Sequence, residues 1–116
     1  MELSVATHLV SAYAVVEVGG EVDVYTAPRL KERLNEVVGS GQSDIVVDLS
    51  RVDFLDSTGL GVLVGVHRRM QRSGGSLALV CPHDRLLKIF RIAGLDTIFR
   101  IYGSVAEATS GPAADG

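Results

Sequence analysis

The chain has 116 residues, of which 47% are hydrophobic and 22% are charged, and its formal net charge at pH 7 is -3. These values are typical of one soluble globular domain, and they give no electrostatic reason to expect a nucleic acid as partner. No segment approaches the roughly 18 uninterrupted apolar residues of a membrane span, and the N-terminus lacks a signal-peptide pattern. We therefore expect a cytoplasmic protein without a membrane partner, and the single cysteine, Cys81, agrees with a reducing compartment.

The first part of the chain predicts two strands and a helix. Residues 3–7 and 12–18 alternate between polar and apolar side chains, which indicates a hairpin or two adjacent strands. Thr26 is placed as an N-cap, with Pro28 in the first turn of a helix that ends at Gly39. The chain thus begins with two strands in succession, before any helix.

The rest of the chain alternates between strands and helices. The predicted elements are a strand at 45–49, a helix from Ser57 to Met70, a strand at 77–81, a helix from Leu86 to Ala93, a strand at 98–102 and a helical turn from Ser104 to Ala108. The β-branched residues of the strand at 45–49 suit a central position, buried on both faces. This order predicts a mixed sheet with helices packed on it, and residues 109–116 predict a frayed tail.

Ser57 lies at the predicted turn from strand to helix, the edge where open α/β sheets usually place their sites. One interpretation is a helix cap, although Asp56 and Thr58 beside it supply further capping groups. The other is a phosphorylation site, because a phosphoserine carries about -1.5 to -2 charges at pH 7 and a helix N-terminus offers free N–H groups to it. Such a modification would change the surface and leave the fold intact.

The helix after Ser57 carries two different stripes on a helical wheel. The apolar stripe predicts the core side and consists of Leu60, Leu63, His67 and Met70. The opposite stripe consists of Ser57, Gly61, Gly65, Arg68 and Arg72. Each glycine costs about 0.8–1 kcal/mol relative to alanine in a helix, so the glycines indicate either a close-packed partner or tight packing within the fold. We favour a partner because this stripe lies opposite the apolar one.

Four short segments together resemble the STAS domain of bacterial anti-sigma factor antagonists. They are Gly20-Glu21-Val22-Asp23, Thr26-Ala27-Pro28, Asp56-Ser57-Thr58-Gly59-Leu60 and Ile92-Ala93-Gly94-Leu95-Asp96. The resemblance spans nearly the whole chain, and its most specific part is the Asp-Ser-Thr-Gly turn. It implies an α/β fold with a mixed sheet of four to five strands and three to four helices, in a STAS domain of residues 1–108 followed by a flexible tail at 109–116.

The same resemblance implies a partner-switching regulator and not an enzyme. The unmodified protein would bind an anti-sigma factor that is also a serine kinase, phosphorylation at Ser57 would block that binding, and a PP2C-type phosphatase would restore it. The expected partner-binding residues are Asp23, Asp56, Ser57, Thr58, Gly59, Gly61, Gly65 and Arg68. The alternative is a STAS binding subunit of a lipid-transport or stress-sensing complex, in which Ser57 is only a cap.

A catalytic site or a metal site fits the sequence less well than a partner-switching regulator does. The segment Leu55–Gly59 is close to the Gly-x-Ser-x-Gly nucleophile elbow but lacks its first glycine. His67 falls on the core side of the helix. The triad order would need an acid between the serine and the histidine, and there is none between Ser57 and His83. His8, the other histidines and Cys81 have no spacing suited to a metal, so we expect neither a metal nor a cofactor.

A phospho-aspartate receiver is the last rival, because Asp48 lies near the end of the predicted strand at 45–49. Receivers alternate strand and helix from the start and need a lysine late in the sheet. This chain opens with two strands, and its strands at 77–81 and 98–102 contain no lysine. We therefore interpret Asp48 as a capping or turn residue.

Overall fold

The computed structural model of the protein describes residues 2–110; Met1 and residues 111–116 lie outside the described part of the chain. The elements in this part are β1 (Leu3–Val10), β2 (Tyr13–Val22), α1 (Ala27–Gly39), β3 (Asp44–Leu55), α2 (Ser57–Arg72), β4 (Ser76–Val80), α3 (Asp84–Ile92), the 3₁₀ helix η1 (Leu95–Thr97), β5 (Arg100–Tyr102) and α4 (Val105–Ser110). The predicted α/β class, with a mixed sheet and helices packed on it, is confirmed.

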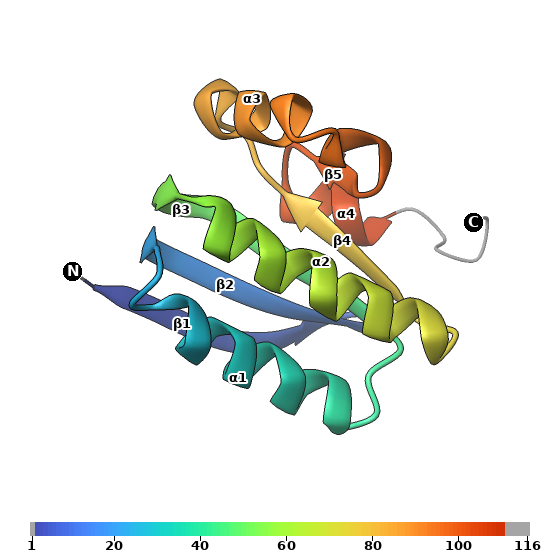
Figure 1. The fold of residues 1–116 in the computed structure, drawn as a ribbon. Coiled ribbons are helices and arrows are strands. Elements are labelled where there is room, and N and C mark those ends of the chain that lie inside the picture. Colours follow the sequence, from blue (N-terminus) through green and yellow to red (C-terminus); the bar gives the residue numbers. More distant parts are fainter. Residues whose placement is uncertain (1, 111–116) are drawn as a thin grey trace.

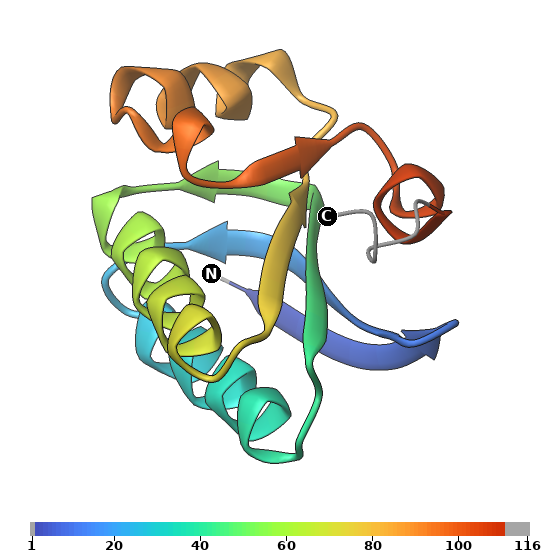
Figure 2. The same ribbon diagram turned by 90° about the vertical axis from the view of Figure 1, so that its right-hand side faces the viewer.

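The five strands form one sheet in the order β1-β2-β3-β4-β5. β1 pairs with β2 in antiparallel orientation, and the other neighbours are parallel. Helices α1 and α2 lie side by side on one face of this sheet, whereas α4 covers part of the opposite face (Figures 1 and 2). β3 is the central strand, and Ile45, Val46 and Val47 are all buried, as the sequence predicts.

The core has two parts because successive residues of a strand point to opposite faces. The larger part lies between the sheet and helices α1 and α2, and includes Val16 of β2, Leu30 of α1 and Leu63 of α2. The smaller part lies under α4, where Val15 of β2 packs in one cluster with Ala108. α2 is therefore held by one buried side, and its other side remains at the surface.

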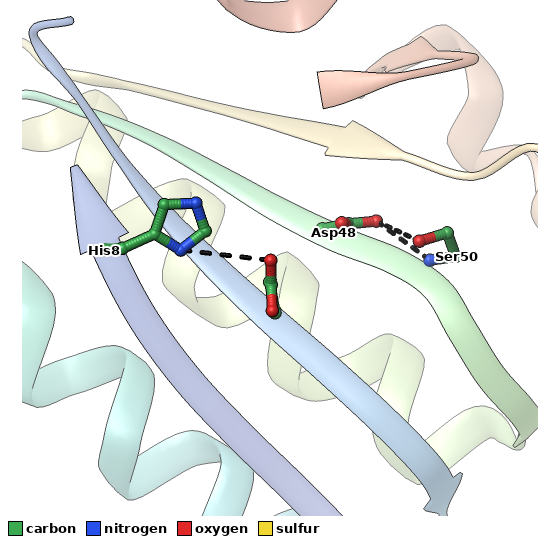
Figure 3. A network of polar contacts seen from close by, with 4 residues as sticks. His8, Asp48 and Ser50 are labelled. Atoms are coloured by element: carbon green, nitrogen blue, oxygen red, sulfur yellow. Dashed lines mark hydrogen bonds and ion pairs between the residues drawn. The ribbon is translucent and has the colours of Figure 1, made fainter. Parts of the chain in front are cut away.

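β3 extends well beyond the predicted strand and ends at Leu55. Two bulges, each of which inserts one extra residue into β3, interrupt the alternation of its side chains between the two faces of the sheet. The first bulge lies next to Asp48, whose Oδ1 accepts hydrogen bonds from the backbone N–H of Ser50 (3.0 Å) and from its hydroxyl (2.7 Å). Both side chains point away from α1 and α2 (Figure 3). The turn predicted at Asp48 is therefore wrong, since this residue lies within a strand.

The C-terminal elements differ from the prediction in their limits. β5 begins at Arg100 and not at residue 98, because η1 occupies the preceding turn. The predicted cap at Ser104 is confirmed, since its Oγ accepts the N–H of Glu107 at 3.1 Å. α4 continues to Ser110 and so takes in the first two residues of the predicted tail, whose remainder lies outside the described residues. No helix within residues 2–110 has the length and apolarity needed to cross a membrane.

Candidate functional site

The turn before α2 is organised by Asp56. Its backbone is extended (φ -108°, ψ -175°), and its N–H donates to the carbonyl of Val22 at 3.2 Å, which fixes the turn to the end of β2. Its Oδ1 accepts hydrogen bonds from the N–H groups of Thr58 (2.9 Å) and Gly59 (3.2 Å). Asp56 is thus the N-cap of α2, and two of the free N–H groups of the first turn are satisfied by one carboxylate.

Ser57 is the first residue of α2, and its side chain is exposed. Within residues 2–110 its hydroxyl has no hydrogen-bond partner, because the capping role belongs to Asp56. The cap interpretation of Ser57 therefore does not hold. A group attached to its oxygen would stand in solvent at the positive end of the α2 dipole.

A second loop, between β2 and α1, lies beside this turn. Asp23 Oδ1 accepts hydrogen bonds from the N–H of Tyr25 (2.9 Å) and the N–H of Thr26 (3.0 Å), and it lies 3.3 Å from the hydroxyl oxygen of Thr26. The pKa of Asp23 is lowered, above all by the backbone hydrogen bond from Thr26. Thr26 stands at the N-cap position of α1, as predicted, but its hydroxyl donates to the carbonyl of Glu21 at 2.8 Å and makes no capping hydrogen bond to the helix. Asp23 thus shapes the loop from within.

Three large apolar side chains are exposed around the two loops: Val24 (58%), Tyr25 (87%) and Phe54 (49%). They lie close to the turn because β2 and β3 are paired up to their ends, with Glu21 opposite Phe54 and Val22 opposite Leu55. Aromatic side chains are enriched at the centres of protein interfaces. The sequence does not predict these three residues as part of the site. The one indication it contains is a large aromatic residue, Tyr25, in a loop.

The predicted outward stripe of α2 is present. Ser57, Gly61, Gly65, Arg68 and Arg72 are all exposed, and the predicted core residues of the opposite side are buried. A Cβ added at Gly61 or Gly65 would meet no atom within 4 Å. Tight packing within the fold is therefore excluded as the reason for these two glycines.

Gly59 differs from the other two glycines of α2. It is buried, and a Cβ added to it would lie 2.6 Å from both Leu55 Cδ1 and Val22 Cγ1. The absence of a side chain lets α2 approach the ends of β2 and β3 closely. The expectation that Gly59 contacts a partner is therefore corrected to a packing role beneath the turn.

An open groove of about 600 Å3 runs between α1 and α2. Thr58 and the exposed glycines Gly61 and Gly65 line it from α2, and four residues of α1 line the other side. Near its far end Arg69 Nη1 donates to Asn35 Oδ1 at 2.7 Å and so links the two helices. Arg68 is exposed but does not line the groove. The contribution of α1 to this surface could not be recognised from α2 alone.

The remaining chemically reactive side chains lie away from Ser57. His67 is 8% exposed, its ring centroid is 5.0 Å from that of Phe99, and burial lowers its pKa. Cys81 is buried, and burial raises the pKa of its thiol. His83 contacts the carbonyl of Ser50 through Nε2. Among residues 2–110 no group of three or more His, Cys, Asp or Glu side chains is placed to hold a metal ion.

Comparisons with known proteins agree on one family. The family model of the STAS domain matches residues 4–108. The anti-sigma-B factor antagonist of Staphylococcus aureus (strain NCTC 8325 / PS 47) is 37% identical over 101 residues, which cover 87% of this chain and 94% of that protein. The protein of the same name from Bacillus subtilis (strain 168) is 43% identical over 86 residues, or 74% and 78% of the two chains. The crystal structure of an anti-sigma factor antagonist from Mycobacterium paratuberculosis has a TM-score of 0.88 at 28% identity, and the match covers 94% of this chain and 92% of that one.

Proposed function

This chain belongs to the STAS domain family, in which its relatives are named anti-sigma factor antagonists, and we propose that it is the switchable antagonist of a cytoplasmic partner-switching module. In its unmodified form it binds an anti-sigma factor that is also a serine kinase, and this binding frees a sigma factor. Phosphorylation of Ser57 by the kinase blocks the binding, and a PP2C-type phosphatase restores it. The chain contributes no catalytic residue of its own.

The observation that carries this proposal is the free hydroxyl of Ser57. The side chain is exposed, and Asp56 makes the capping hydrogen bonds of the turn, so a phosphate can be added or removed without loss of a structural contact. The phosphate would place about -1.5 to -2 charges next to the Asp56 carboxylate. A partner that fits the neutral serine would then meet a larger and strongly charged group.

The surroundings of Ser57 support a protein partner over a small substrate. The exposed side chains of Val24, Tyr25 and Phe54 provide apolar contact area, and Gly61 and Gly65 leave the surface of α2 open to close approach. Buried apolar and aromatic anchors with a polar rim are the usual composition of a protein interface. In this proposal Asp23 acts indirectly, because it holds the loop that carries Tyr25.

The test is phosphorylation by the serine-kinase anti-sigma factor of the same organism. The protein is incubated with this kinase and ATP, and the phosphate is located by mass spectrometry. We expect label at Ser57, no label in Ser57→Ala and unchanged labelling in Thr58→Ala, the matched control at the next exposed hydroxyl. Isothermal titration calorimetry should show that the phosphorylated protein binds the kinase at least about tenfold more weakly than the unmodified one.

Two results would contradict the proposal. Label at another residue would remove Ser57 as the switch. Equal affinity of the phosphorylated and unmodified forms would show that the phosphate does not control binding, and the alternative of a STAS binding subunit without a switch would then be favoured.

A further inference from the structure

The groove between α1 and α2 has an apolar floor. The residues that form it are Ala27 and Pro28 of α1 and Val62 and Val66 of α2. On the α2 side the wall is low, because Gly61 and Gly65 have no side chains. An exposed apolar surface of this kind favours an occupant that can bury it.

The charged residues that line the groove are all cations: Lys31, Arg69 and Arg72. None of them has a carboxylate within ion-pair distance in residues 2–110, where the ion pairs are His8–Glu17 and Arg33–Glu36. The chain as a whole has a net charge of -3, so this concentration of unpaired positive charge contrasts with the rest of the molecule. The groove therefore presents charges that an acidic occupant would complement.

The dimensions of the groove suit a helix. Thr58 and Arg72 line its two ends, and the rise from one position to the other along α2 is about 21 Å, or roughly four helical turns. An apolar floor between cationic walls is the complement of an amphipathic helix with an apolar face and acidic flanks. We propose that the groove binds an acidic amphipathic helix of the anti-sigma factor, an inference that rests on the function proposed above.

The position of Ser57 connects this groove to the switch. Thr58, which lines one end, is the next residue, so a phosphate on Ser57 would stand at the mouth of the groove. Its charge would repel the acidic flank of an incoming helix, and the effect would act over about 8 Å, the Debye length at physiological salt. Phosphorylation would thus weaken binding by repulsion and not by a change of fold.

Two matched peptides provide the first test. One is a labelled synthetic helix of about 15 residues with leucine on one face and glutamate on its flanks, and the other has lysine in place of every glutamate. By fluorescence anisotropy, the acidic peptide should bind the unmodified protein at least about tenfold more tightly than the basic one. The double variant Lys31→Glu with Arg72→Glu should reverse this preference.

The control is a double variant on α3, Lys88→Glu with Arg91→Glu, which changes the net charge by the same amount outside the groove. It should keep the preference for the acidic peptide, and circular dichroism should show that both double variants are folded. Equal binding of the two peptides by the wild type would overturn the proposal. So would an acidic preference that survives in Lys31→Glu with Arg72→Glu.

The same variants separate this proposal from the function on which it rests. With the serine-kinase anti-sigma factor as probe, Lys31→Glu with Arg72→Glu should lower the affinity at least about tenfold, and the α3 control should leave it unchanged. If the kinase binds and labels Ser57 but the groove variant has no effect, the groove proposal fails and the switch stands. If the kinase neither binds nor labels the protein while the peptides behave as expected, the switch fails and the groove stands as a site for acidic helices.

Discussion

The Asp56 carboxylate accepts the backbone N–H of Thr58 at 2.9 Å, and this bond begins α2. Asp56→Ala removes the cap and should lower the free energy of unfolding by about 1 kcal/mol, whereas Asp56→Asn keeps an acceptor and should lose less. Ser57→Ala should change it by less than about 0.5 kcal/mol, because the hydroxyl makes no bond within the described residues. Urea denaturation measures all three. A larger loss for Ser57→Ala than for Asp56→Ala would return the capping role to Ser57.

Gly59 and Gly61 lie two residues apart in α2 and should respond oppositely to alanine. In Gly59→Ala the new Cβ meets the buried side chains of Leu55 and Val22 at 2.6 Å, which should cost about 1–3 kcal/mol. This cost should outweigh the gain of up to about 1 kcal/mol in helix propensity, so the variant should be less stable than the wild type. In Gly61→Ala the Cβ meets nothing within 4 Å, so the gain of up to about 1 kcal/mol should appear as increased stability. Chemical denaturation of the two variants tests this, and equal stability would contradict the packing role of Gly59.

Tyr25 should contribute to partner binding and not to stability. Its side chain is 87% exposed, so Tyr25→Ala should alter the free energy of unfolding by less than about 0.5 kcal/mol. Because Tyr25 is an aromatic residue beside the Ser57 turn, Tyr25→Ala should weaken binding to the serine-kinase anti-sigma factor by about 1–2 kcal/mol. Ile92→Ala is the matched control, because Ile92 is 78% exposed on α3, outside the groove and the Ser57 turn. Equal losses of affinity for the two variants, measured by calorimetry, would argue against an interface centred on the turn.

The features that the sequence predicts well are local. The two stripes of α2 follow from the helical period, and the place of Ser57 at the start of the helix follows from a turn that joins a strand to a helix. Both depend on neighbours within a few residues along the chain. Gly59 shows the limit of this reasoning. One of the two atoms that leave no room for a side chain there belongs to Val22, which is distant in sequence.

The features that could not be predicted depend on register. The two bulges in β3 break its alternation, so the strand could not be followed to Leu55 and the exposure of Phe54 could not be foreseen. The groove likewise exists only because α1 and α2 lie side by side, which brings Lys31 and Arg72 into one surface. Which side chains share a surface is a property of strand pairing and helix packing, and no single segment contains it.

His67 should make stability depend on pH. Its side chain is buried in the core side of α2, and its Nδ1 has no hydrogen-bond partner within residues 2–110. Burial lowers its pKa below the usual value of 6.5, so the unfolded chain takes up a proton at a pH where the folded protein does not. The contribution of His67 to the free energy of unfolding should therefore be complete above about pH 6.5. It should fall as the pH decreases below that value, until the pKa of His67 in the folded protein is reached.

The variant His67→Phe isolates this effect. A phenyl ring replaces the imidazole beside Phe99 and leaves no unpaired nitrogen, so the dependence on pH between about 7.5 and 5.5 should become nearly flat. His8→Gln is the control, because His8 is exposed on β1 and is not part of the core. Asp23, whose pKa is lowered, contributes stability that is lost only as the pH falls below 3.8, so the two effects are separate. Urea denaturation at a series of pH values measures the difference, and a slope near pH 6 that remains in His67→Phe would show that another group is responsible.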